Sequence, residues 1–148
     1  MENPIHTNPV FYALGVGIAF FFGGCALEND HDTILERLQG DWEVEKVEIG
    51  GELIPLDKVH NKHFILKGSQ LIATMSPKDP AEVHLAPDAN PAWIDLTDRD
   101  KMVMLGIYRF DGHSWEICIG DVGDPRPTEF KTTAGTRTCI MVLRRKAK

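Results

Sequence analysis

The sequence predicts an all-β fold, an up-and-down antiparallel β-barrel of about eight strands preceded by a short helix. Two observations support this prediction. After Gly40 the chain consists of short runs rich in Val, Ile, Trp, Phe and Thr, separated by Gly, Pro, Asp and Asn. None of these runs has the length of a crossover helix, so neighbouring strands must be antiparallel. A sheet of this kind has exposed edges unless it closes, and a barrel closes it.

The stretch DTILERLQG is the expected helix. Asp32 is placed to cap its start, the apolar side chains from Ile34 to Leu38 form one stripe, and Gly40 ends it. One or two turns are too short to be stable alone. We therefore expect this helix to pack against the barrel.

Nine runs are predicted to be strands, with tight turns at Gly50-Gly51, Gly68-Ser69 and Asp111-Gly112. In chain order they are DWEVEKVEI, ELIPL, HFILK, QLIATM, EVHLA, PAWIDLT, MVMLGIYRF, SWEICI and TRTCIMVLRR.

The first strand carries an irregularity in its alternation. Trp42 and Val44 share one parity, whereas Val47 and Ile49 have the opposite one. Successive side chains in a strand point to opposite faces, so a regular strand could not bury all four. A bulge near Glu45 or Lys46 would bring them to the same face.

Composition indicates one soluble globular domain, expected to be a monomer. The chain has 148 residues, of which 43% are hydrophobic and 26% charged. Residues 1–24 contain one acidic residue and no Lys or Arg, so the remainder keeps 16 basic and 21 acidic residues and a net charge of −5. A negative charge disfavours nucleic acid as a partner.

Residues 1–24 are predicted to be a signal peptide. The uncharged stretch from Val10 to Gly24 is 15 residues long, whereas a membrane-spanning helix needs about 20. Gly23-Gly24 stands directly before Cys25, which resembles the lipoprotein signal of bacteria. That resemblance implies acylation of Cys25, cleavage before it, and a lipoprotein on the periplasmic side of a membrane. An ordinary secretory signal, an uncleaved anchor and a buried helix remain alternatives.

The rest of the chain divides into a tether, residues 25–31, and a domain, residues 32–148. Within residues 34–146 the order of several short motifs resembles the uncharacterised lipocalin-like domain family that is abundant in planctomycete bacteria. These motifs are LQGDW, GGELIP, IDLT, LGIYRFDG, WEICIG, RPTEF and IMVLRR. The resemblance implies a small lipocalin-like β-barrel, often exported and without an assigned activity.

The Gly-x-Trp motif of lipocalins is matched by Gly40 to Trp42. In that fold a helical turn precedes the motif, and the tryptophan closes one barrel end beneath an arginine from near the chain terminus. The resemblance implies that Arg144 or Arg145 stacks on Trp42 here.

Four polar residues lie inside the resemblance motifs: Asp95, Tyr108, Arg126 and Glu129. Arg126 and Glu129 either fix their loop or line a ligand pocket. The residues expected in the barrel interior are Met75, Met102, Met104, Leu105, Trp115 and Ile117. The candidate ligand-binding residues are Met75, Met102, Met104, Tyr108, Trp115, Arg126 and Glu129.

Cys118 and Cys139 lie in strands that a meander places next to each other. They are a possible disulfide or two separate thiols, depending on register. His60 and His63 form an H-x-x-H pair without further ligands of suitable spacing. We therefore expect no metal and no cofactor.

The function predicted from the sequence is non-enzymatic. A membrane-anchored domain of this class is expected to bind a small apolar ligand, a peptide or another envelope protein. One alternative is an enzyme with a polar site at the barrel mouth, formed by Tyr108, Arg126 and Glu129. The other is a structural interaction module whose barrel is filled with side chains. Neither a nucleophile elbow nor a glycine-rich phosphate loop occurs in the sequence.

Overall fold

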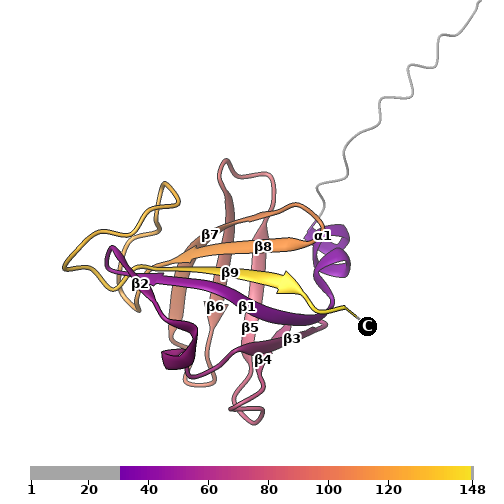
Figure 1. Ribbon diagram of the computed structural model, residues 1–148. Helices are drawn as coiled ribbons and strands as arrows, with labels where there is room; N and C mark the ends of the chain where they lie inside the picture. The colour runs from indigo at the N-terminus through magenta and orange to yellow at the C-terminus, as the bar shows by residue number, and fades with distance from the viewer. Residues whose placement is uncertain (1–30, 148) are drawn as a thin grey trace, which may run out of the picture.

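The computed structural model describes residues 31–147 as a closed antiparallel β-barrel with one short α-helix at one end (Figure 1). The predicted fold class is confirmed. The elements are α1 His31–Leu38, β1 Gly40–Ile49, β2 Glu52–Ile54, the 3₁₀ turn Leu56–Lys58, β3 His63–Lys67, β4 Gln70–Ala73, β5 Ala81–Ala86, β6 Ala92–Thr97, β7 Val103–Phe110, β8 Ser114–Ile119 and β9 Cys139–Arg145.

Eight of the strands form the barrel wall, in the order β1-β3-β4-β5-β6-β7-β8-β9, and β9 pairs back with β1. The first half of β1 pairs with β3, whereas its second half pairs with β2. The short β2 and β3 therefore pair with the same edge of β1, at different parts of its length. Every pairing is antiparallel, and each strand neighbours the next along the chain except at these β1 contacts.

The predicted bulge in β1 is confirmed. The pairing of β1 with β9 shifts register between Val44 and Lys46. Because of this shift, Trp42, Val44 and Val47 are all buried on one face, whereas Ile49 at the end of β1 is 40% exposed.

Side chains fill the barrel interior. Trp42 and Trp115 are fully buried and meet edge to face, with 5.5 Å between ring centroids. An eight-stranded barrel is only just wide enough for its own side chains. The other fully buried side chains of this core are Leu38, Leu66, Ile94, Ile117 and Leu143.

Helix α1 closes one end of the barrel, and its last turn is held by two side chains. The Trp42 indole Nε1 donates to the carbonyl of Leu38 at 2.9 Å. The Arg145 guanidinium lies 4.4 Å from the Trp42 ring centroid and donates to the carbonyls of Arg37 and Gln39. These bonds satisfy carbonyls that a helix end otherwise leaves unpaired.

The lipocalin resemblance implied that Arg144 or Arg145 stacks on Trp42, and Arg145 is the one that does so. Arg144 points outward instead and pairs with Glu45 at 2.8 Å. The expectation that Asp32 caps the start of the helix is wrong, because α1 already includes His31 and Asp32 lies within it.

Residues 120–138, the covering loop, cross the outside of the barrel between β8 and β9. Phe130 packs there with Ile107, Cys118 and Ile140, a second small core on the outer face. Thr132 is buried, and its hydroxyl donates to Glu48 at 2.5 Å and accepts from the Gly51 amide at 2.8 Å. The covering loop is thereby attached to β1 and β2 as well as to β7 and β8.

Candidate functional site

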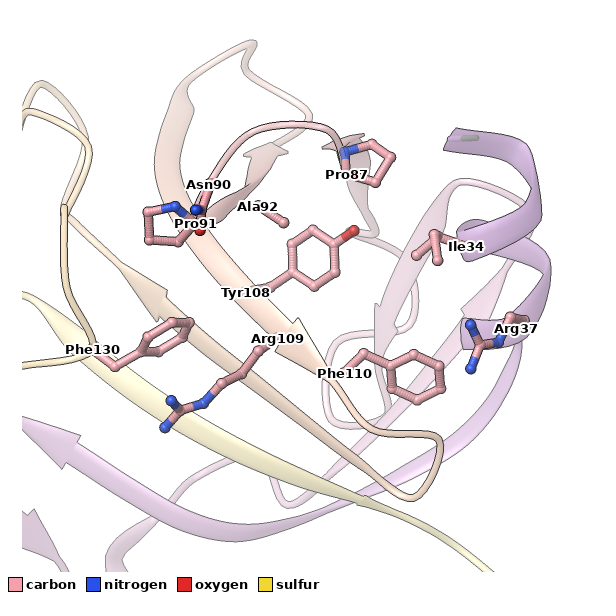
Figure 2. Close-up of a pocket in the computed structure, with 10 residues that line it drawn as sticks. All are labelled: Ile34, Arg37, Pro87, Asn90, Pro91, Ala92, Tyr108, Arg109, Phe110 and Phe130. Atoms are coloured by element: carbon pink, nitrogen blue, oxygen red, sulfur yellow. The ribbon is translucent and has the colours of Figure 1, made fainter. Parts of the chain in front are cut away.

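The α1 groove is a hollow of about 480 Å³ between α1, the β5–β6 turn and the end of β7 (Figure 2). Its volume falls within the range of about 300–1,000 Å³ that is usual for small-molecule sites. The residues that line it are Ile34, Arg37, Pro87, Asn90, Pro91, Ala92, Tyr108, Arg109, Phe110 and Phe130.

The β5–β6 turn forms one wall of the α1 groove. Pro87 and Pro91 fix the backbone of this turn, because the ring of proline locks φ. The Asn90–Pro91 peptide bond is cis. The next residue, Ala92, pairs with Tyr108 across β6 and β7. Its small side chain leaves space beside the Tyr108 ring.

Tyr108 forms the floor of the α1 groove. The residue is only 5% exposed, and Figure 2 shows its ring between the Pro87–Ala92 segment and α1. Burial raises the pKa of Tyr108 to about 12. The hydroxyl therefore stays protonated at neutral pH and keeps its capacity to donate a hydrogen bond.

Two arginines lie over aromatic rings at the sides of the α1 groove. The Cζ atom of Arg37 is 5.2 Å from the Phe110 ring centroid, and that of Arg109 is 4.3 Å from the Phe130 centroid. These are cation–π distances. Arg109 also pairs with Glu116 through Nε.

The chemistry of the α1 groove suits binding more than catalysis. Its described lining contains no Ser, Thr, Cys, His, Asp or Glu. It therefore lacks the side chains that most often act as nucleophile or general base. Proline, aromatic and aliphatic surfaces with a few polar groups are typical of binding sites for small apolar molecules.

Two larger hollows elsewhere are lined mostly by polar and charged residues. One, of about 710 Å³, lies between the two arms of the covering loop, where Arg137 pairs with Asp121 at 3.2 Å. The other, of about 740 Å³, lies beside Arg145, which already stacks on Trp42. Arg137 and Arg145 are thus engaged within the protein.

The predicted site residues are dispersed. Tyr108 lies in the α1 groove, but Arg126 lies on the outer face of the barrel. Its guanidinium donates to Asp95 at 2.6 Å and to the Gly106 carbonyl at 2.7 Å, and it stacks on Trp93 at 4.3 Å. Arg126 therefore fixes the covering loop, as one of the two sequence interpretations proposed, with Asp95 as its partner instead of Glu129.

The enzyme alternative combined Tyr108, Arg126 and Glu129, and the structure does not bring them together. The Tyr108 side chain belongs to the inner core, whereas Arg126 contacts the outer face and Glu129 is exposed on the covering loop.

Half of the expected interior residues are placed correctly. Trp115 and Ile117 are fully buried, and Met104 packs partly buried against the core. The expectation is wrong for Met75 and Met102, which are 60% and 46% exposed. Both lie just beyond a strand end, where period-2 alternation no longer decides direction.

The expectation is also wrong for Leu105. It pairs with Asp95, whose side chain meets Arg126 outside the barrel. Paired residues share a face, so Leu105 is on the outer side.

The possible disulfide is likewise excluded. Strands β8 and β9 are neighbours as predicted, but Cys118 pairs with Ile140 and Cys139 with Ile119. This offset of one residue places the two side chains on opposite faces, and both cysteines are free thiols. Burial raises the pKa of Cys118, and it raises that of Cys139 to about 11.

Comparison with known proteins gave no match to a protein-family model, a curated protein or a solved structure. Within residues 31–147, no helix has the length and hydropathy to span a bilayer. The same residues contain no cluster of three or more His, Cys, Asp or Glu able to hold a metal ion. Cys25 and the predicted signal lie outside the described residues.

Sequence reasoning missed most of the α1 groove. Arg37 of α1 and Phe110 of β7 share no motif with Pro87 and Asn90 of the β5–β6 turn. The Asn90-Pro91 dipeptide was the one available signal, because it marks a turn.

Proposed function

We propose that this chain is an exported lipoprotein with a lipocalin-like barrel domain that binds a small apolar molecule in the α1 groove. The observation that carries the proposal is the contrast between the filled interior and the open groove beside it. Trp42 and Trp115 occupy the space in which a hollow barrel would hold a ligand. A ligand of this barrel is therefore expected at its end.

The lining supports an apolar ligand of modest size. Ile34, Pro87 and Pro91 offer aliphatic surface on two sides, and Tyr108 and Phe110 offer ring surface between them. Removing such surface from water contributes roughly 25 cal/mol per Å². A ligand with a short alkyl chain or a single ring system matches the volume of the groove.

Asn90 allows a test of the groove, because it is exposed and lines the hollow, whereas Asp88 is exposed in the same turn and does not line it. With octan-1-ol as the probe, NMR titration of the full chain should shift the amides of Ala92, Tyr108 and Phe110. Asn90→Trp should abolish these shifts by filling the groove, and Asp88→Trp should leave them unchanged.

Two results would contradict the groove as a binding site. One is an absence of amide shifts in the unsubstituted protein up to millimolar octan-1-ol. The other is a set of shifts that persists fully in Asn90→Trp.

Export and lipidation are part of the proposal and rest on the Gly23-Gly24-Cys25 sequence that follows an apolar stretch. Acyl chains on Cys25 would contribute about 0.8 kcal/mol per buried methylene to membrane binding. Cys25→Ser should release the protein from the membrane fraction in its own host and change its mobility on a denaturing gel. A variant that still partitions with membranes at unchanged mobility would argue against lipidation.

A further inference from the structure

The α1 groove has an electrostatic character opposite to that of the whole chain. The net charge of the protein is −6, yet the described lining contains Arg37 and Arg109 and no carboxylate. A positive site in an acidic protein raises the local concentration of anions.

Arg37 has spare hydrogen-bonding capacity. Its side chain forms no ion pair with any residue in 31–147, and its guanidinium stacks on Phe110. A guanidinium presents five N–H donors in a planar fork that matches a carboxylate. The Phe110 ring holds this fork beside the groove without using its donors.

Arg109 is only partly engaged. It pairs with Glu116 through Nε, while its Cζ atom lies over the Phe130 ring. The charge of Arg109 is thus offset by a neighbour, whereas that of Arg37 is not paired with any acidic side chain in residues 31–147. The end of the groove at α1 is therefore the more favourable one for an anion.

Tyr108 supplies a further donor on the side of β7 that faces α1, opposite to the side that carries Arg109 (Figure 2). Its hydroxyl has no hydrogen-bond partner among the residues that the structure describes. A tyrosine hydroxyl is protonated at neutral pH, and burial raises the pKa of Tyr108 further, so this hydroxyl can donate to an acceptor on a bound molecule.

We infer that the ligand of the α1 groove is an amphiphile with a short apolar body and one carboxylate-like anionic group. Arg37 holds this anionic group, and the Tyr108 hydroxyl donates to it as well. This inference rests on the proposed function of the groove. The apolar walls contributed by Ile34, Pro87 and Pro91 exclude an inorganic anion as the complete ligand, because it would leave them without contact. The absence of carboxylates from the described lining disfavours a cation.

Octanoate and octan-1-ol test this inference as a matched pair, since they have the same chain length and differ in charge. NMR titration of the full chain should show octanoate binding at least about fivefold more tightly than octan-1-ol, with shifts centred on α1 and Tyr108. The preference should fall as salt is added.

Arg37→Gln should remove most of this preference, and Arg37→Lys, which keeps the charge, should restore part of it. Arg99→Gln is the matched control, because Arg99 is an exposed arginine paired with Asp79 in the loop at the opposite end of the barrel. It should leave both affinities unchanged.

The outcomes separate the inference from the proposed function. Equal affinities for the two probes in the groove, or an octanoate preference that survives Arg37→Gln, would overturn the anionic assignment and leave apolar binding intact. If neither probe shifts the groove residues, the proposed function fails together with the inference. If octanoate shifts only the amides around the hollow beside Arg145, both the proposed function of the α1 groove and the inference about its ligand are overturned.

Discussion

Two regions of this barrel use arginine on an aromatic ring, and they use it differently. In the covering loop, Arg126 stacks on Trp93 and also donates to Asp95 and the Gly106 carbonyl. At the α1 groove, Arg37 stacks on Phe110 and pairs with no carboxylate in residues 31–147.

The difference shows why arginine–aromatic stacking alone does not identify a binding site. Arg126 is largely buried, with 18% of its side chain exposed, and its Nη1 donates to both Asp95 and the Gly106 carbonyl. Such a group contributes to stability. An arginine that is stacked but not bonded keeps its donors for another molecule.

Replacing each arginine by glutamine should separate these roles. Arg126→Gln should lower the free energy of unfolding by about 1–3 kcal/mol, because it leaves Asp95 and the Gly106 carbonyl without a charged donor. Arg37→Gln should change the same quantity by no more than about 0.5 kcal/mol, as for ordinary surface positions. Urea unfolding followed by tryptophan fluorescence measures both. Equal losses in the two variants would contradict the comparison.

Cys118 reports whether the stability lost in Arg126→Gln is local to the covering loop. Its Sγ atom lies under this loop, 3.6 Å from the Glu129 carbonyl oxygen, and burial raises its pKa. Loosening the loop should speed alkylation of Cys118 by iodoacetamide at pH 8 about tenfold, the factor that corresponds to about 1.4 kcal/mol. Mass spectrometry of the modified peptides gives the rate.

Cys139 is the internal control for that labelling experiment, because it faces the other side of the sheet. Its alkylation should stay slow in both proteins, since its pKa is about 11 and little thiolate forms at pH 8. A parallel increase at both cysteines would indicate global unfolding and not loop opening.

The smallest expected effect concerns the hydrogen bond from Thr132 to Glu48, which attaches the covering loop to β1. The hydrogen bond from Thr132, followed by that from Lys46, lowers the pKa of Glu48 below its ordinary value of 4.5. Stability from a lowered carboxyl pKa is present above the ordinary pKa and is lost as pH falls through the native one. Glu48→Gln should therefore lower the melting temperature at pH 6–7, and the difference should shrink below about pH 4.5.

Glu52→Gln, an exposed acid in β2, is the control for this pH dependence. Melting curves that show the same pH dependence for the unsubstituted protein and Glu48→Gln would contradict the role given to Glu48.

The sequence was informative about the barrel because its strands carry local signals. Alternation around Trp115 and the glycine turns located β8 and its neighbours, and the change of parity between Trp42 and Val47 located the bulge. These signals depend only on residues close together in the chain. They faded at strand ends, where Met75 and Met102 were placed inside in error.

The candidate site could not be predicted in the same way. The position of Cys118 relative to Cys139 depends on a register that is set across a long loop. The α1 groove depends on three-dimensional closure, which brings Arg37 of α1 beside Phe110 of β7. The local sequence around either residue does not predict this contact.

The pairing of β1 with β9 also has a consequence for how the protein is made. It joins the first strand of the barrel to the last, so the contacts that close the wall are among the least local in the fold, a feature associated with slow folding. While a ribosome has yet to add residues 139–145, both β1 and β8 lack their partner. The nascent chain is then an open sheet with two unpaired edges, and we expect it to need protection from aggregation until β9 emerges.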